Sequence, residues 1–472
     1  MRYYLFRWPQ PSGLLQQQVQ LLGGQPHGHL KVSFVSLITP SPRSIKNSLP
    51  KASPTANYNH ARDRRMKESL GRDFNRVWGS GLITNLADGV LKLAAPLLAI
   101  TLTEDPVKIS LLSALALLPW LFFAIPIGGI VDRIDGKLAL VVGNLVRSVV
   151  AILLAYAVFQ EAITVELLLL SVFLIGICEV LVDTTSQAMI PSLLKSDQLE
   201  RGNSRLNTSE VIIAQFVGTP LSGFLYAIAI SLPFFLSGIG FVIAAIIIGL
   251  TAFQINPKPV SESDKGKGRF TAELKEGIRY MYEEKRIFHL VVITTGLGFF
   301  FSLATAISPL FIVKELGVAP RYFGLLIAIQ GIGALVGSLL APRISERLGR
   351  GRALSMNLLI ASVPVVLIGL APNVWFFVPL SVITGATISI WNVLLMSAYQ
   401  SLIPRELYGR IHGARRTIVW GLMPLGSVAG GFIALGGLRL PYIVGGVISL
   451  IIVLVSYRRI VEIGNSSSQI YS

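Results

Sequence analysis

Five ionisable residues lie well inside long apolar segments of the chain, and their types and spacing could do chemistry. They are Asp88, Lys92, Arg147, Glu179 and Asp183, while Glu166 and Glu210 lie near the ends of such segments, where water can reach them. Asp88 and Lys92 are four residues apart on one helical face, so they can neutralise each other. Glu179 and Asp183 are also four apart, but like charges repel, so they need a shared proton or a basic partner such as Arg147 or Lys92. Acids in such surroundings can take up and release protons, which makes Asp88, Glu179 and Asp183 candidates for proton coupling.

The segments that carry these residues are long, apolar and numerous. Of the 472 residues, 52% are hydrophobic and 14% are charged, whereas soluble domains carry about 25% charged residues. An α-helix needs about 20 residues to cross a bilayer. Twelve spans are predicted, at 79–103, 109–131, 138–160, 163–190, 210–231, 234–255, 287–313, 322–342, 353–371, 374–398, 412–435 and 440–457. We therefore expect an all-α membrane protein, and a soluble enzyme is excluded.

Basic residues are distributed unevenly between the predicted loops. Twelve spans put both termini on one side, which holds 35 Lys and Arg residues, whereas the opposite loops hold four. The positive-inside rule assigns the basic side to the cytoplasm, so we expect cytoplasmic termini and a plasma-membrane location. The net charge of +16 then reports topology, and no nucleic-acid partner is expected.

Two short segments recur at nearly the same interval along the chain. An acidic residue followed by arginine occurs at Asp132 and again at Glu346, 214 residues later. The string that ends at Pro191 recurs at Pro404, 213 residues later. Such self-similarity is typical of duplicated transporter halves, so twelve transmembrane helices in two six-helix halves are predicted.

The chain divides accordingly into five parts. Residues 1–72 hold eleven basic and two acidic residues, and we expect a disordered or dispensable extension, with an organelle transit peptide as the alternative. The two halves are 73–255 and 287–458. Between them, 256–286 is a cytoplasmic linker, and 459–472 is a cytoplasmic tail. The linker contains an amphipathic helix at the membrane surface, whose apolar face holds Phe270, Leu274, Ile278 and Met281.

Motifs in two loops and one span resemble those of a known transporter superfamily. The loop residues are Gly128, Asp132, Arg133 and Lys137, with an echo at Glu346, Arg347, Gly349 and Arg350. They resemble the loop motif of the major facilitator superfamily, although Asp135 stands where that motif has glycine. The span-five element consists of Gly218, Pro220 and Gly223. Together with the string at 187–191, it is similar to the branch of the enterobactin exporter and macrolide efflux proteins, which implies a secondary exporter.

The motif residues also have physical roles that do not depend on the resemblance. Gly136 would supply backbone freedom in the tight turn of the first loop, and the neighbouring charges either latch one conformation or form only a solvated turn. In span five, Pro220 breaks one helical hydrogen bond, while Gly218 and Gly223 let a neighbouring helix approach, so the element serves packing or gating. A Gly-x-x-x-Gly pair in span eight forms a packing face.

Aromatic and amide residues in spans seven and ten are candidates for lining a cavity. In the resembled fold, spans one, four, seven and ten surround a central cavity. This implies a cavity lined by Phe299, Phe300, Trp391 and Asn392, and packing against lipid is the equal alternative.

The predicted function is proton-coupled export of an amphipathic small molecule such as a drug, a macrolide or a siderophore. No phosphate-binding loop is present to use ATP. The alternatives are a lipid or lysolipid transporter and a non-transporting membrane scaffold. The motifs HExxH, GxSxG and CxxC do not occur, so we expect no enzyme activity, no metal and no cofactor. Expected partners are the substrate, protons and membrane lipids, for a chain that acts as a monomer.

Overall fold

The structure is a computed structural model of the chain. It describes residues 70–131, 133–195, 198–251, 279–403 and 408–466. These residues form helices and their connections, and no strand occurs among them, which confirms the predicted all-α membrane fold. Residues 1–69 of the predicted N-terminal extension, most of the predicted linker and Asp132 lie outside the described residues.

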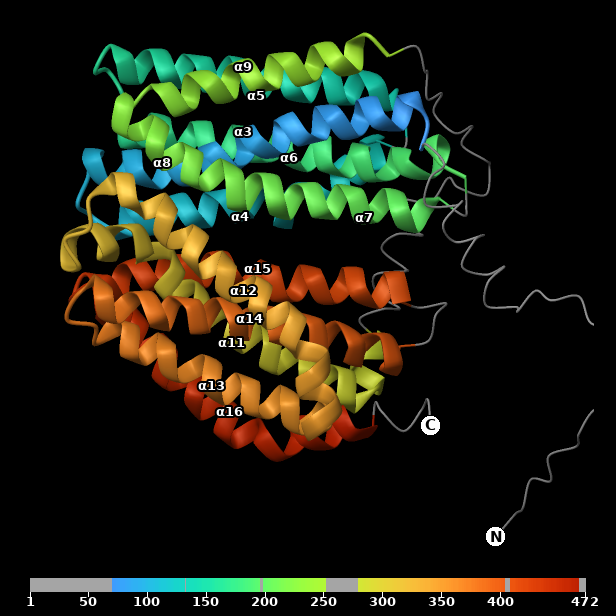
Figure 1. The fold of residues 1–472 in the computed structure, drawn as a ribbon, viewed down its shortest axis with the longest axis vertical. Helices are drawn as coiled ribbons and strands as arrows, with labels where there is room; N and C mark the ends of the chain where they lie inside the picture. The colour runs from blue at the N-terminus through green and yellow to red at the C-terminus, as the bar shows by residue number, and fades with distance from the viewer. Residues whose placement is uncertain (1–69, 132, 196–197, 252–278, 404–407, 467–472) are drawn as a thin grey trace, which may run out of the picture. The chain divides into compact units, whose positions relative to one another are not determined.

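The helices follow one another in two groups along the chain (Figure 1). The first group comprises α3 (Arg72–Leu102), α4 (Pro106–Val131), α5 (Gly136–Phe159), α6 (Val165–Leu193), α7 (Leu199–Ser209), the π-helix η1 (Glu210–Gly218), α8 (Thr219–Ile228) and α9 (Leu232–Gly249). The second group comprises α11 (Lys285–Leu310), the π-helix η3 (Phe311–Glu315), the short 3₁₀ helix η4 (Pro320–Tyr322), α12 (Phe323–Leu348), α13 (Arg350–Gly369), α14 (Val374–Leu402), α15 (Tyr408–Ala434) and α16 (Leu440–Ser466). We call the side where α3 starts and α16 ends the terminal side, and the side of the α3–α4 connection the far side.

Ten of the described helices are long and apolar enough to cross a membrane. The fifth and eleventh predicted spans correspond to shorter apolar segments, Ile212–Ile228 and Ile418–Ala434, which lie inside longer helical runs. The ten helices and the two shorter segments are together consistent with the twelve predicted spans.

The last helix extends beyond the predicted end of its span. α16 continues to Ser466, so residues 459–466 of the predicted tail are helical. Ile460 and Ile463 are buried, and Gly464 lies against the backbone of Gly351 in α13. Packing on a neighbouring helix therefore holds this segment in helical conformation, although its sequence is no longer uniformly apolar.

Two apolar side chains near predicted domain boundaries are buried in the helical part. Leu70 is 2% exposed and belongs to a buried cluster with Phe74 and residues at the end of α6, so the packed part begins before residue 73. Met281 is also 2% exposed and belongs to the core of the second group. It is therefore packed on the protein and not laid on the membrane surface, while the other three residues of that predicted apolar face lie outside the described residues.

Small residues let the helices approach closely. A Cβ atom on Gly333 of α12 would collide with the carbonyl of Val382 in α14, and one on Gly337 would collide with that of Ala386. The predicted packing face of span eight is therefore used against α14. Between the two groups, α4 contacts α15 and α8 contacts α12, which brings the groups side by side (Figure 1).

The turn between α4 and α5 is built differently from the prediction. Gly136 does not adopt a positive φ; it is the first residue of α5 and lies against Met189 of α6, so its predicted role in backbone freedom is wrong. Asp135 caps α5 by accepting a hydrogen bond from the backbone N of Lys137 at 2.8 Å. In the second repeat, Gly349 has a φ of +76°, and there the turn does require glycine.

Candidate functional site

The five ionisable residues of α3, α5 and α6 form what we call the charged cluster: Asp88, Lys92, Arg147, Glu179 and Asp183. Its buried part is an ion pair in which Arg147 Nη2 donates a hydrogen bond to Asp88 Oδ1. Arg147 is completely buried, and its guanidinium lies 4.1 Å from the ring centroid of Phe241 in α9. A charge at this depth needs an opposite charge, and Asp88 provides it.

The second ion pair of the charged cluster joins α3 to α6. Lys92 Nζ lies 3.2 Å from Glu179 Oε1. The pairing of Lys92 with Asp88 that the spacing suggests is therefore wrong, because Asp88 is taken by Arg147 and the long Lys92 side chain reaches α6. The Lys92 side chain is 60% exposed, so this part of the charged cluster borders accessible space.

Asp183 is the acid that remains without a cation. It lies one turn beyond Glu179 on α6, is half-buried, and forms no ion pair with any side chain that the structure describes. The charges of Glu179, Arg147 and Lys92 act on it, and so does the exposed carboxylate of Glu210 in η1, which is not counted in the charged cluster. With three acids and two cations, the fully ionised charged cluster has a net charge of −1. Uptake of one proton would make it neutral.

The buried end of the charged cluster has unused hydrogen-bonding groups. Arg147 Nε and Nη1 and Asn144 Oδ1 are buried without a partner in the part of the chain that is described. Asn144 lies about one turn before Arg147 on α5, and its Nδ2 donates to Leu140 O at 2.9 Å. Each unsatisfied buried group costs about 1–3 kcal/mol, so a bridging water would stabilise this end. Sequence reasoning missed Asn144 because it carries no charge.

Two cations of the loop motif hold neighbouring helices on the terminal side. Lys137 Nζ donates to Thr251 O at the end of α9, at 2.7 Å. Arg350 Nη1 donates to Ser401 Oγ of α14, at 3.3 Å. A cation near the last carbonyls of a helix is stabilised by the helix dipole, so Lys137 fixes the end of α9 in this conformation.

The other charges of the loop motif are exposed in this conformation. Arg133, Glu346 and Arg347 are all exposed, and none forms an ion pair with a side chain in the described ranges. Gly128 has open space where a side chain would begin, and Asp132 lies outside the described residues. A conformational latch at these residues stays a prediction.

The span-five element is a close-packing site between three helices. A Cβ atom on Gly218 would lie 2.9 Å from Gly89 Cα in α3. On the other face, a Cβ on Gly324 of α12 would lie 3.0 Å from Pro220 Cα, and one on Gly223 would lie 3.5 Å from Gly324 N. These contacts account for the small residues by packing, and a gating role stays a prediction.

The aromatic and amide candidates of spans seven and ten occupy different surroundings. The rings of Phe299 and Phe300 contact each other edge to face with centroids 5.1 Å apart. Trp391 packs against the core of the second group, and Asn392 is exposed. Within the described residues, no ring contact or hydrogen bond joins the two pairs. A common cavity lined by all four therefore stays a prediction.

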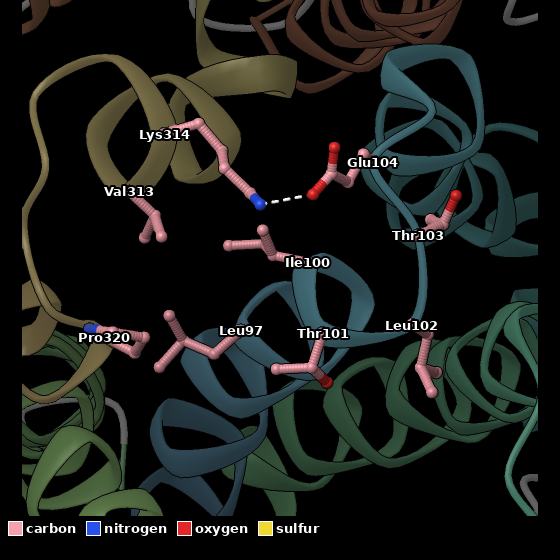
Figure 2. Close-up of a pocket in the computed structure, with 9 residues that line it drawn as sticks. All are labelled: Leu97, Ile100, Thr101, Leu102, Thr103, Glu104, Val313, Lys314 and Pro320. Atoms are coloured by element: carbon pink, nitrogen blue, oxygen red, sulfur yellow. Dashed lines mark hydrogen bonds and ion pairs between the residues drawn. The ribbon is translucent and has the colours of Figure 1, made fainter.

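A cavity of about 470 Å³ lies at the far side, and none of the charged cluster residues lines it (Figure 2). It is lined by Leu97, Ile100, Thr101, Leu102, Thr103, Glu104, Val313, Lys314 and Pro320. Glu104 of the α3–α4 connection and Lys314 of η3 form an ion pair beside it. Sequence reasoning missed this pair, because the two residues lie in different groups, 210 positions apart.

Other cations of the far side are paired as well. Lys108 Nζ lies 2.9 Å from Glu166 Oε1 within the first group, and Arg439 Nε lies 3.0 Å from Glu315 Oε2 within the second. Three of the four basic residues that the sequence assigns to this side are thus held by acids of the same side. The presence of acids in the same few loops as these basic residues was the feature of the sequence that could have predicted these ion pairs.

The arrangement of helices is similar to that of solved membrane transporters. One similar solved structure is a bacterial homologue of the iron transporter ferroportin in an inward-facing state. It has a TM-score of 0.63 and 14% sequence identity, and the alignment covers 83% of this chain and 100% of that chain. At this identity the likeness concerns the fold.

The sequence comparison narrows the class. Residues 71–471 match the family described as transmembrane secretion effector, and the chain belongs to this family of the major facilitator superfamily. Macrolide efflux protein A of Streptococcus pyogenes is 22% identical over 360 residues, which is 75% of this chain and 87% of that protein. Macrolide efflux protein A of Enterococcus faecalis is 23% identical over 320 residues, or 67% and 97%. The chain is thus a multi-pass membrane transporter of the macrolide efflux branch, as its motifs indicate.

Proposed function

We propose that this transporter exports an amphipathic small molecule in exchange for protons, with a macrolide as the first candidate substrate. The relatives named macrolide efflux protein support the direction and the substrate class. We place the protein in the plasma membrane, with the terminal side in the cytoplasm and the far side outside, because 35 basic residues belong to the terminal side and four to the far side. We propose that it acts as a monomer.

The observation that carries the proposal is the net charge of −1 on the fully ionised charged cluster. Arg147 with Asp88 and Lys92 with Glu179 are two neutral pairs, and Asp183 has no cation of its own. An unpaired carboxylate in a membrane span is costly, so a proton on Asp183 removes a net charge from the span. The predicted spans of the second half contain no acid. Coupling to protons is therefore assigned to the first group.

A cycle of alternating access follows from this charge balance. When the site faces outward, Asp183 takes a proton and the substrate leaves. The protonated, neutral charged cluster then turns inward, where Asp183 releases its proton as substrate binds. Because the site holds either the proton or the substrate but not both, inward movement of protons drives outward movement of the substrate.

The experiment is efflux from proteoliposomes that contain the full-length protein and a radiolabelled macrolide. An imposed pH gradient should drive the macrolide against its concentration gradient, and a protonophore should abolish this accumulation. A parallel assay follows a fluorescent lysolipid without any gradient. Macrolide movement that ignores the pH gradient would contradict proton coupling, and movement of the lysolipid alone would assign the protein to lipid transport.

A further inference from the structure

The end of span seven contacts both groups of helices through adjacent residues. In η3, Lys314 forms its ion pair with Glu104 of the first group, whereas Glu315 Oε2 lies 3.0 Å from Arg439 Nε at the start of α16. The two residues are neighbours in sequence, yet their partners belong to different groups of helices. This turn is π-helical, a local geometry that is frequent at functional sites.

The second group holds η3 by several independent contacts. Phe311 is completely buried, and its ring centroid lies 4.7 Å from that of Tyr442 in α16. Arg439 not only pairs with Glu315 but also donates from Nη1 to Ala371 O at 2.9 Å, just beyond the end of α13. Because buried aromatic packing attaches η3 to α16, we expect η3 to move together with the second group.

The contact of η3 with the first group is of a different kind. Glu104 and Lys314 have side chains that are 77% and 44% exposed, and both line the far-side cavity (Figure 2). Ile100 of α3 lies in the same lining and is 7% exposed. An exposed ion pair shifts an equilibrium by only about 1.4- to 5-fold, which is strong enough to bias two conformations and weak enough to break in each cycle.

We propose that the Glu104–Lys314 ion pair is a gate on the far side, which closes the cavity between α3 and η3 in the present conformation. When the two groups separate on this side, this ion pair breaks, while η3 stays attached to α16 through the Glu315–Arg439 pair. The gate requires no particular substrate and no particular coupling ion, so it goes beyond the proposed function.

The first test measures access to the cavity without any substrate. In a Cys178→Ser background, which removes the single native cysteine, Ile100→Cys reports on the cavity by its rate of labelling with a membrane-impermeant maleimide in intact cells. Glu104→Gln and Lys314→Met should each raise this rate about two- to five-fold. The exchanged pair Glu104→Lys with Lys314→Glu should return it toward the parent value.

The matched control is Lys108→Met, which removes a far-side ion pair that lies wholly within the first group. It should leave the labelling rate unchanged. A labelling rate that does not rise in Glu104→Gln or Lys314→Met overturns the gate, and so does an equal rise in the control.

The second test locks the gate during transport. In the same cysteine-free background, Glu104→Cys with Lys314→Cys is joined by a short, reducible thiol crosslinker, which should stop macrolide efflux until a reductant is added. The matched pair Glu315→Cys with Arg439→Cys, joined in the same way, should leave efflux intact. Continued efflux by the locked gate pair overturns the proposal. If no variant moves a macrolide even before crosslinking, the proposed substrate is wrong, and the labelling rates still decide the gate.

Discussion

Replacing Asp183 with asparagine should uncouple transport from the proton gradient. Asparagine keeps the shape of the side chain but cannot take up a proton at this position. Asp88 with Arg147 and Glu179 with Lys92 remain paired in the variant, so the net charge of the charged cluster becomes zero and stays zero through the cycle. The fold should be preserved, because Asp183 is half-buried and forms no ion pair with a described side chain.

The size of the effect follows from the number of unpaired acids. One proton exchanged per substrate supplies about 1.4 kcal/mol for each pH unit, which supports about a tenfold concentration ratio at zero membrane potential. Wild-type proteoliposomes should therefore reach about a tenfold ratio at a gradient of one pH unit. In Asp183→Asn this ratio should fall to about one, while exchange of labelled for unlabelled substrate continues.

The assay compares uphill accumulation with exchange in the same vesicles. Potassium with valinomycin holds the membrane potential at zero, and equilibrium binding of the macrolide in detergent checks that the site survives. Glu166→Gln is the matched control, since Glu166 lies at the far end of the same helix α6 with its side chain 70% exposed. If Asp183→Asn still concentrates the macrolide tenfold, the excess acid is not the coupling group and the charge argument is refuted.

Further outcomes follow from the same structure. Lys92→Met combined with Glu179→Gln removes one neutral pair and keeps the net charge at −1, so uphill efflux in proteoliposomes should persist, whereas Lys92→Met alone should reduce it. Gly333→Ala should lower the free energy of unfolding by about 1–3 kcal/mol, because its Cβ meets backbone of α14; Gly79→Ala, a helical position with no atom nearby, should not lower the stability measured by thermal unfolding in detergent. In the gate, Lys314 holds the pKa of the Glu104 carboxyl below its ordinary value of 4.5. The Glu104–Lys314 ion pair therefore stabilises the closed state at an external pH above 4.5, and this stabilisation is lost as the pH falls below 4.5 and Glu104 becomes protonated. Maleimide labelling of the cavity, relative to a free peptide thiol, should be flat from about pH 8 to 6 and rise only in stronger acid.

Several features of the fold could be predicted from the sequence because they depend on local composition. Apolar segments of membrane-spanning length predict helices wherever they occur. Inside a bilayer there is no water, so a single segment can satisfy the hydrogen bonds of its own backbone only as a helix. Helix ends were less accurate. α16 continues past its apolar segment because Ile460 and Ile463 are buried by neighbouring helices, and the π-helix η1, which forms the first part of span five, continues directly from α7. Neither feature is encoded in hydrophobicity alone.

The sequence by itself determined which acids and bases lie within the membrane spans. Its motifs also indicated the transporter family. It also showed that the predicted spans of the second half carry no acid. Only the tertiary structure decided the partners. Helical spacing favours an ion pair between Asp88 and Lys92. Side-chain length and interhelical distance instead pair Asp88 with Arg147 of α5 and Lys92 with Glu179 of α6. The Glu104–Lys314 pair likewise depends on how the two groups of helices meet. Local periodicity fixes the face of a helix, whereas the choice of partner depends on which other helix lies opposite that face.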